Sequence, residues 1–181
     1  ARNLKTPVIS SITSYSSNQL KVKWGNVSGA SYYQLYRSTS KNGTYKYVAT
    51  VKGKEYTDSS LKTGKSYYYK VRAVNKTGSV KGYSSYSKVV SGSTLQTASI
   101  NKAYSYTSSQ IKLQMKTIKG ASGYQIYRST SKNGSYQKVA ETSSATYLDK
   151  KLSGGKTYYY KVRAIKKQKS GKGYGSFSGI K

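Results

Sequence analysis

The feature that most constrains this chain is an internal repeat with an offset of 91 residues. Residues 33–43 read YQLYRSTSKNG and residues 124–134 read YQIYRSTSKNG. The heptapeptide YYYKVRA occurs at both 67–73 and 158–164, and the copies align without an insertion. A repeat of this length predicts two similar domains of about 90 residues, because each copy is long enough to bury a core of its own.

The alignment also sets the expected domain boundaries. We expect the first domain at residues 6–94 and the second at residues 97–181. Only a few residues around Leu95 and Gln96 lie between them, which is too short for a long flexible tether.

Within each copy the local pattern predicts β-strands. Leu20, Val22 and Trp24 alternate with lysines, which is the period of two expected where one face of a strand is buried. Residues 33–36 and 67–73 alternate in the same way, and no comparable window has helical spacing. Turn residues punctuate these runs, at Gly25-Asn26, Asn42-Gly43, Lys52-Gly53, Thr63-Gly64 and Lys81-Gly82. About seven short strands per copy, separated by such turns, predict an all-β sandwich.

These residues resemble the fibronectin type III family. Trp24 stands where that family has the core tryptophan of its second strand, and Tyr67 stands where it has the tyrosine of its corner motif. Leu152, Gly155 and Tyr158 fill the corner positions of the second copy. The resemblance implies two tandem seven-stranded immunoglobulin-like, or fibronectin type III, β-sandwiches.

The repeated phrase is also similar to repeats in large extracellular proteins of Gram-positive bacteria, which implies a secreted or cell-wall-associated protein. The chain departs from the family pattern at three positions. Met115 replaces the core tryptophan in the second copy, and Thr63 and Gly154 stand where the family often has proline.

The composition argues against an enzyme. The chain has no His and no Cys, so it lacks the usual proton shuttle at neutral pH and the usual ligands of transition metals. Its only carboxylate side chains are Glu55, Asp58, Glu141 and Asp149. The repeat aligns Asp58 with Asp149 but Glu55 with Thr146, so no acid pair is preserved. We therefore expect the aspartates to be structural and to accept hydrogen bonds from backbone amides, with no catalytic residue, metal site or cofactor.

Aromatic and basic side chains share one predicted sheet face. If Tyr69 and Val71 point inward, their neighbours point outward, and the candidate binding residues are Tyr36, Tyr68, Lys70, Arg72, Tyr127, Tyr159, Lys161 and Arg163. Such rings can stack on sugars while the cations meet acidic groups. The structural alternative is that rings and lysine stems stabilise the sheet through cross-strand contacts.

The charge balance predicts anionic partners. The chain carries 33 Lys+Arg against 4 Asp+Glu, a formal net charge of +29 divided as about +12 and +15 between the two copies. A field of this size attracts polyanions at low salt. Only five cations are Arg, so nucleic acid is expected to bind only without specificity. Lysines concentrate at Lys166, Lys167, Lys169 and Lys172, in the expected last hairpin loop.

Two functional hypotheses follow. The first is a non-catalytic tandem β-sandwich that serves as a spacer or presentation element and adheres electrostatically to an anionic cell-wall polymer or acidic glycan. The alternative is a specific binding module for an acidic glycan or a protein partner. The sequence has no apolar run of about 18 residues, so we expect no membrane insertion.

Overall fold

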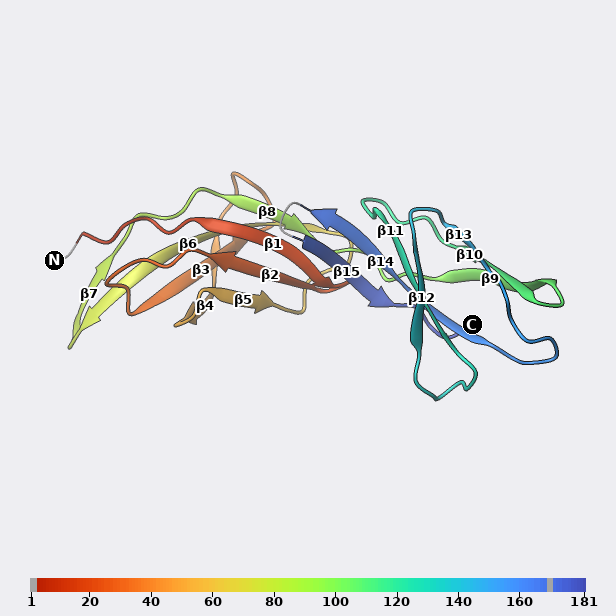
Figure 1. The fold of residues 1–181 in the computed structure, drawn as a ribbon. Helices are drawn as coiled ribbons and strands as arrows, with labels where there is room; N and C mark the ends of the chain where they lie inside the picture. The colour runs from red at the N-terminus through yellow and green to blue at the C-terminus, as the bar shows by residue number, and fades with distance from the viewer. Residues whose placement is uncertain (1–2, 169–170) are drawn as a thin grey trace. The chain divides into compact units, whose positions relative to one another are not determined.

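The computed structural model describes residues 3–168 and 171–181. Every regular element within them is a β-strand, and the chain divides into two compact units, residues 1–94 and 95–181 (Figure 1). Over the same residues, the structure contains no helix of the length and apolar character that a membrane crossing requires.

Unit 1 is a sandwich of two antiparallel sheets. Its strands are β1 (Ile9–Ser16), β2 (Gln19–Trp24), β3 (Tyr32–Ser38), β4 (Lys46–Val51), β5 (Glu55–Asp58), β6 (Ser66–Thr77), β7 (Val80–Tyr83) and β8 (Val90–Ser93). One sheet has the order β1-β2-β5 and the other the order β4-β3-β6-β7. Strand β8 pairs with the opposite end of β6 from β7, so the two segments share one strand position. The unit therefore has the seven strand positions that the sequence predicts.

Unit 2 repeats this topology. Its strands are β9 (Ile100–Thr107), β10 (Gln110–Met115), β11 (Gly123–Ser129), β12 (Gln137–Thr142), β13 (Thr146–Asp149), β14 (Tyr159–Gln168) and β15 (Gly171–Phe177). The sheets have the orders β13-β10-β9 and β12-β11-β14-β15. Lys181 exchanges two backbone hydrogen bonds of 3.0 Å with Tyr160, the position at which Val90 pairs with Tyr69 in unit 1.

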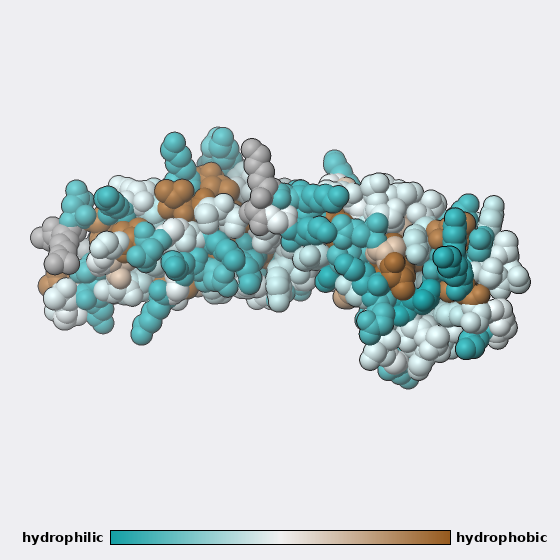
Figure 2. Space-filling view, in the orientation of Figure 1, coloured by the Kyte–Doolittle hydropathy of each residue, from teal (hydrophilic) through white to brown (hydrophobic). Residues whose placement is uncertain are grey.

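Each unit has its own core between its two sheets. In unit 1 the predicted inward positions Leu20, Val22, Trp24, Leu35 and Tyr69 are all buried. The equivalent core of unit 2 contains Met115 in place of the tryptophan. Figure 2 shows hydrophilic residues over much of the visible surface of each unit, with hydrophobic residues only in small patches. The all-β fold and the alternating burial are therefore confirmed.

The tyrosine corner is present in both units. The Tyr67 hydroxyl accepts a hydrogen bond of 2.8 Å from the backbone N–H of Lys62. In unit 2 the Tyr158 hydroxyl accepts one of 3.0 Å from the backbone N–H of Ser153. Each hydroxyl thereby fixes the loop that leads into the central strand of the larger sheet.

The last hairpin differs from the sequence prediction. Lys81 and Gly82 lie within β7, and the turn falls instead at Gly78, whose φ of 60° suits a residue without a Cβ atom. Correspondingly, Lys166 and Lys167 lie on β14 and Lys172 on β15 rather than in a loop. Lys169, the remaining member of the predicted lysine cluster, lies outside the described residues.

Candidate functional site

The two aspartates are buried and structural, but their partners are not the backbone amides that the sequence predicts. Both Asp58 carboxylate oxygens accept hydrogen bonds of 2.8 Å from Arg37 Nη1, and Oδ2 also accepts one of 2.7 Å from the Tyr69 hydroxyl. Side-chain donors replace the expected backbone amides because Asp58 ends strand β5 and its carboxylate is buried. Asp58, Arg37 and Tyr69 form a hydrogen-bonded triad. The charge of Asp58 is therefore balanced by a guanidinium, as a buried carboxylate requires.

Unit 2 contains the same triad. Arg128 Nη1 donates to both oxygens of Asp149 at 3.1 and 2.9 Å, and the Tyr160 hydroxyl donates to Oδ2 at 2.7 Å. Burial, together with the hydrogen bond to aspartate, raises the pKa of the Tyr69 and Tyr160 hydroxyls far above the ordinary value. These tyrosines are fixed hydrogen-bond donors.

The two glutamates are surface residues in ion pairs. Glu55 contacts Lys21 at 3.4 Å and Lys23 at 3.3 Å, and these lysines lower the pKa of its carboxyl group. Glu141 contacts Lys172 at 2.8 Å and has a lowered pKa for the same reason. Since the pairs lie on different sheets of their units, they do not form a repeated acid–base site.

The predicted binding face of unit 1 is a stack of rings and cations. Lys70 Nζ lies 4.7 Å from the ring centre of Tyr45 and 4.1 Å from that of Tyr86. The Arg72 guanidinium lies 4.3 Å from the ring of Tyr83, 5.1 Å from that of Tyr86 and 5.6 Å from that of Tyr36. Its Nη2 also donates to the Tyr36 hydroxyl at 3.2 Å. The cations are thus held between tyrosine rings of the same unit.

Unit 2 repeats this stack with different rings. Lys161 Nζ lies 4.6 Å from the ring of Tyr136 and 4.7 Å from that of Phe177. The Arg163 guanidinium lies 4.1 Å from the ring of Tyr174 and 4.9 Å from that of Phe177, and its Nη2 donates to Tyr127 at 3.3 Å. The lysine and the arginine at equivalent positions are therefore stacked on aromatic rings in both units.

The structure brings most of the predicted site residues together. Tyr36, Lys70 and Arg72 share one face of unit 1, and their equivalents share one face of unit 2. Tyr68 and Tyr159 stand further along the same strands, and all eight predicted residues are half-buried.

Sequence reasoning missed the rings supplied by other elements, which are Tyr45, Tyr83, Tyr86, Tyr136, Tyr174 and Phe177. The repeat offset relates Tyr83 to Tyr174 and Tyr86 to Phe177, which was the available signal. These contacts are those of the structural alternative, although Tyr83 and Tyr86 remain exposed at the surface.

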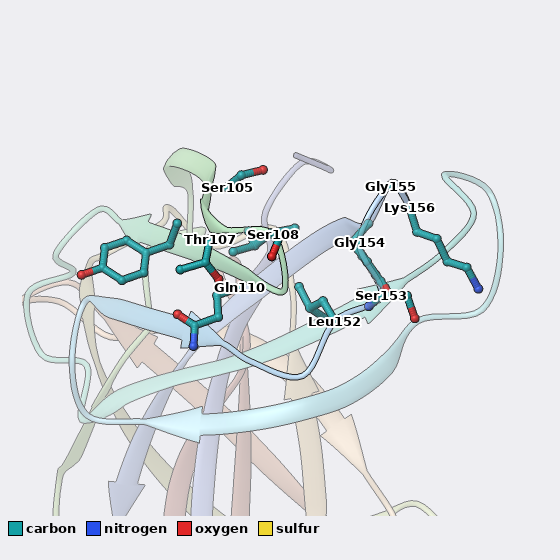
Figure 3. A pocket seen from close by; sticks show the side chains of 12 residues that line it. Ser105, Thr107, Ser108, Gln110, Leu152, Ser153, Gly154, Gly155 and Lys156 are labelled. Carbon is teal, nitrogen blue, oxygen red and sulfur yellow. The ribbon is translucent and has the colours of Figure 1, made fainter.

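A polar hollow lies at one end of unit 2, between the β9–β10 turn and the corner loop (Figure 3). Its volume is about 350 Å³. The lining includes the hydroxyl groups of Ser105, Thr107, Ser108 and Ser153, and Gln110 lies on the side of the β9–β10 turn. Its lining has no carboxylate and no imidazole but includes the ammonium group of Lys156 and the apolar side chains of Ile111 and Leu152, so it offers hydrogen bonds, one positive charge and apolar contacts.

Comparison with known proteins establishes the fold. The crystal structure of the chicken CNTN1 FN1–FN3 domains matches 99% of this chain and 64% of that chain, with a TM-score of 0.57 and 20% identity. A two-domain fibronectin type III segment of chicken tenascin matches 98% of this chain and 99% of that chain, with a TM-score of 0.43 and 17% identity. The likeness to the CNTN1 domains, together with the sheet order of each unit, shows that the chain is in fold a tandem of fibronectin type III β-sandwiches.

In sequence, the chain is similar to Exoglucanase B of Cellulomonas fimi. The two are 29% identical over 143 residues, which is 73% of this chain. The match spans only 12% of the length of the exoglucanase. No family model matches the chain.

Proposed function

We propose that this chain is a non-catalytic tandem module of an extracellular bacterial protein, which spaces or presents neighbouring domains and adheres electrostatically to anionic polymers. The observation that carries this proposal is the charge imbalance of 33 cationic against 4 acidic side chains. In the described residues the acidic groups contact five cations, namely Lys21, Lys23, Arg37, Arg128 and Lys172. Most lysines must therefore take their counterions from solution or from a polyanion.

The sequence similarity supports the modular part of this proposal. The match covers most of this chain but a small fraction of an exoglucanase, which is the relation expected of a non-catalytic part within a larger secreted enzyme. The contacts of the carboxylates also support a non-catalytic module. Asp58 and Asp149 form buried triads, and the glutamates form surface ion pairs. The proposed location is extracellular, either secreted or associated with the cell wall.

A salt titration tests the proposal. We expect lipoteichoic acid, heparin and double-stranded DNA to bind at low salt and to weaken in parallel as the salt concentration rises, because each interaction releases counterions. Absence of binding to all three polymers at about 10 mM ionic strength, where screening extends to about 30 Å, would refute electrostatic adhesion.

The second candidate is a specific binding module for an acidic glycan or a protein, acting through Tyr36, Tyr68, Lys70, Arg72, Tyr127, Tyr159, Lys161 and Arg163. The exposed rings of Tyr83 and Tyr86 beside Arg72 favour it. Salt-resistant binding to one ligand, lost in the Tyr68→Ala or Tyr159→Ala variant, is its expected signature. An affinity for the preferred ligand that these substitutions leave unchanged would reject it.

A further inference from the structure

The smaller sheets of the two units carry different side chains on their outer faces, although their strands align residue for residue. Ser11 and Thr13 of β1 correspond to Lys102 and Tyr104 of β9. On the strand at the other side of the sheet, Glu55 corresponds to Thr146. In the middle strand, Lys23 of β2 corresponds to Gln114 of β10. These exchanges make the unit 2 face more aromatic and remove its carboxylate, while Lys102 replaces the lysine lost at Gln114.

Two exposed tyrosines lie in a row on this face of unit 2. Tyr104 is 41% exposed and Tyr106 is 55% exposed, and both stand on β9. Residues two apart on a strand are separated by about 6.6 to 6.8 Å and point to the same side of the sheet. Lys112 of β10 lies opposite Tyr104 in the strand register, and its Nζ lies 5.4 Å from the ring centre of Tyr106.

Charge also distinguishes this face from its counterpart. In unit 1, Glu55 lies beside Lys21 and Lys23 and neutralises part of their charge. In unit 2 the outward positions of the described strands β9, β10 and β13 include Lys102 and Lys112 and no carboxylate. Two lysines and two exposed rings thus form a compact cationic strip.

We propose that the strip formed by Lys102, Tyr104, Tyr106 and Lys112 binds an anionic polysaccharide that contains uronic acid. The sugar rings stack their C–H faces on the two tyrosines, and the lysines contact the carboxylates. This inference rests on the proposed function, since it names the site and the polymer class for adhesion.

The neighbouring hollow adds neutral hydrogen-bonding groups to the strip. Its lining includes Tyr106, the hydroxyls of Ser105 and Ser108 and the amide of Gln110, together with the ammonium group of Lys156. The hydroxyls and the amide both donate and accept hydrogen bonds, as sugar hydroxyls require. A polyphosphate offers charge without rings or hydroxyls, so it engages the lysines and leaves the aromatic half of the strip unused.

The test compares three probes on the whole chain at physiological ionic strength: oligogalacturonate, polyphosphate of matched charge and an oligo(dT) strand. We expect the double variant Tyr104→Ala/Tyr106→Ala to bind oligogalacturonate at least about tenfold more weakly, because each stacked ring contributes substantially. Polyphosphate affinity should change less than about twofold, since no charge is removed. Tyr15→Ala is the matched control, because Tyr15 is equally exposed and stacked under Lys21 but has Thr13 as its neighbour.

A second pair of variants tests the charge pattern. Thr146→Glu restores the carboxylate of unit 1 and should weaken oligogalacturonate binding several-fold. The unit 1 variant Thr13→Tyr/Glu55→Thr should add a second binding site. Glu55 and Thr146 are exposed and Thr13 is half-buried on the outer face of its strand, and circular dichroism checks the fold of each variant.

The outcomes separate this inference from the proposed function. If the chain binds none of the polyanions even at low salt, electrostatic adhesion fails and this site fails with it. If the polyanions bind but the tyrosine variant loses no oligogalacturonate affinity, only the strip is refuted. Selective loss of oligo(dT) binding would overturn the polysaccharide assignment in favour of single-stranded nucleic acid.

Discussion

The two units share the same strand topology and buried polar contacts but differ in their corner loops and exposed side chains. Their buried triads, tyrosine corners and cation–ring stacks occupy equivalent positions at the offset of 91 residues. They differ at exposed positions and in the corner loops. Thr63 bonds the β1–β2 turn in unit 1, whereas the equivalent Gly154 lines the hollow in unit 2. The buried polar contacts are thus kept in both units, whereas core residues such as Trp24 and Met115, the surface and the loops differ.

The largest expected effect concerns the buried triads. Asp58→Ala leaves Arg37 without its partner and should lower the free energy of unfolding of unit 1 by about 3 kcal/mol, and Asp149→Ala should do the same in unit 2. The value lies at the lower end for buried ion pairs because the Arg37 side chain is about one-third exposed. Urea unfolding followed by the fluorescence of Trp24, the only tryptophan, reports on unit 1.

Unit 2 needs its own probe, which Met115→Trp supplies at the equivalent core position. Glu55→Gln is the control, since its ion pairs are exposed and should change stability by less than about 1 kcal/mol. An aspartate variant that unfolds like the control would mean that the triad contributes no net stability.

The next effect is alkaline destabilisation. The folded pKa of Tyr69 and Tyr160 is raised above the ordinary value of 10.0, so the contribution of each hydroxyl is fully present below pH 10. Above pH 10 the unfolded chain releases these protons and the folded chain does not, so each unit should lose about 1.4 kcal/mol per pH unit. Tyrosinate absorbance and circular dichroism should therefore show two tyrosines that ionise only on unfolding.

The matched variants Tyr69→Phe and Tyr160→Phe should each reduce this dependence in their own unit. A chain in which all 22 tyrosines ionise while the fold remains intact would contradict the buried donors.

The corner tyrosines should have a smaller and unequal effect. Tyr67→Phe removes a hydrogen bond from a buried ring and should cost unit 1 about 1 kcal/mol. Tyr158 is half-buried and its bond is exposed to solvent, so Tyr158→Phe should cost unit 2 less, because water can replace the hydroxyl. Thermal unfolding of the two variants measures the difference, and equal losses would contradict this dependence on burial.

The core was predictable from sequence because strand alternation is a local signal. Leu20, Val22 and Trp24 are buried as their spacing indicates, and Tyr67 accepts its corner hydrogen bond as the family resemblance implies. The partners of Asp58 were not predictable in this way, since Arg37 and Tyr69 come from two other strands and meet it only in the folded sheets.

The stacked rings were missed for a related reason. Residue alternation indicates which side chains point outward, but the rings that cover them come from neighbouring strands and loops. Tyr86 contacts Lys70 and Arg72 from the segment between β7 and β8. Local residue patterns do not predict contacts between segments so far apart in the sequence. The hairpin error at Gly78 arose because Gly82 also looked like a turn residue, whereas strand pairing places it in β7.

The smallest expected effect comes from exchanging the equivalent corner-loop residues Thr63 and Gly154 between the two units. Thr63 Oγ1 donates a 2.7 Å hydrogen bond to the Ser17 carbonyl and ties the corner loop to the β1–β2 turn. Thr63→Gly should therefore cost unit 1 about 1 kcal/mol through the lost bond and the added freedom of the unfolded chain. In unit 2, a Cβ atom at Gly154 would lie 3.3 Å from the Ser108 carbonyl oxygen, so Gly154→Thr requires a small shift of that turn. If the turn moves, the new hydroxyl forms the same tie and stabilises unit 2 by about 0.5 kcal/mol; destabilisation instead would show that the hollow beside Ser108 is held open by a rigid turn.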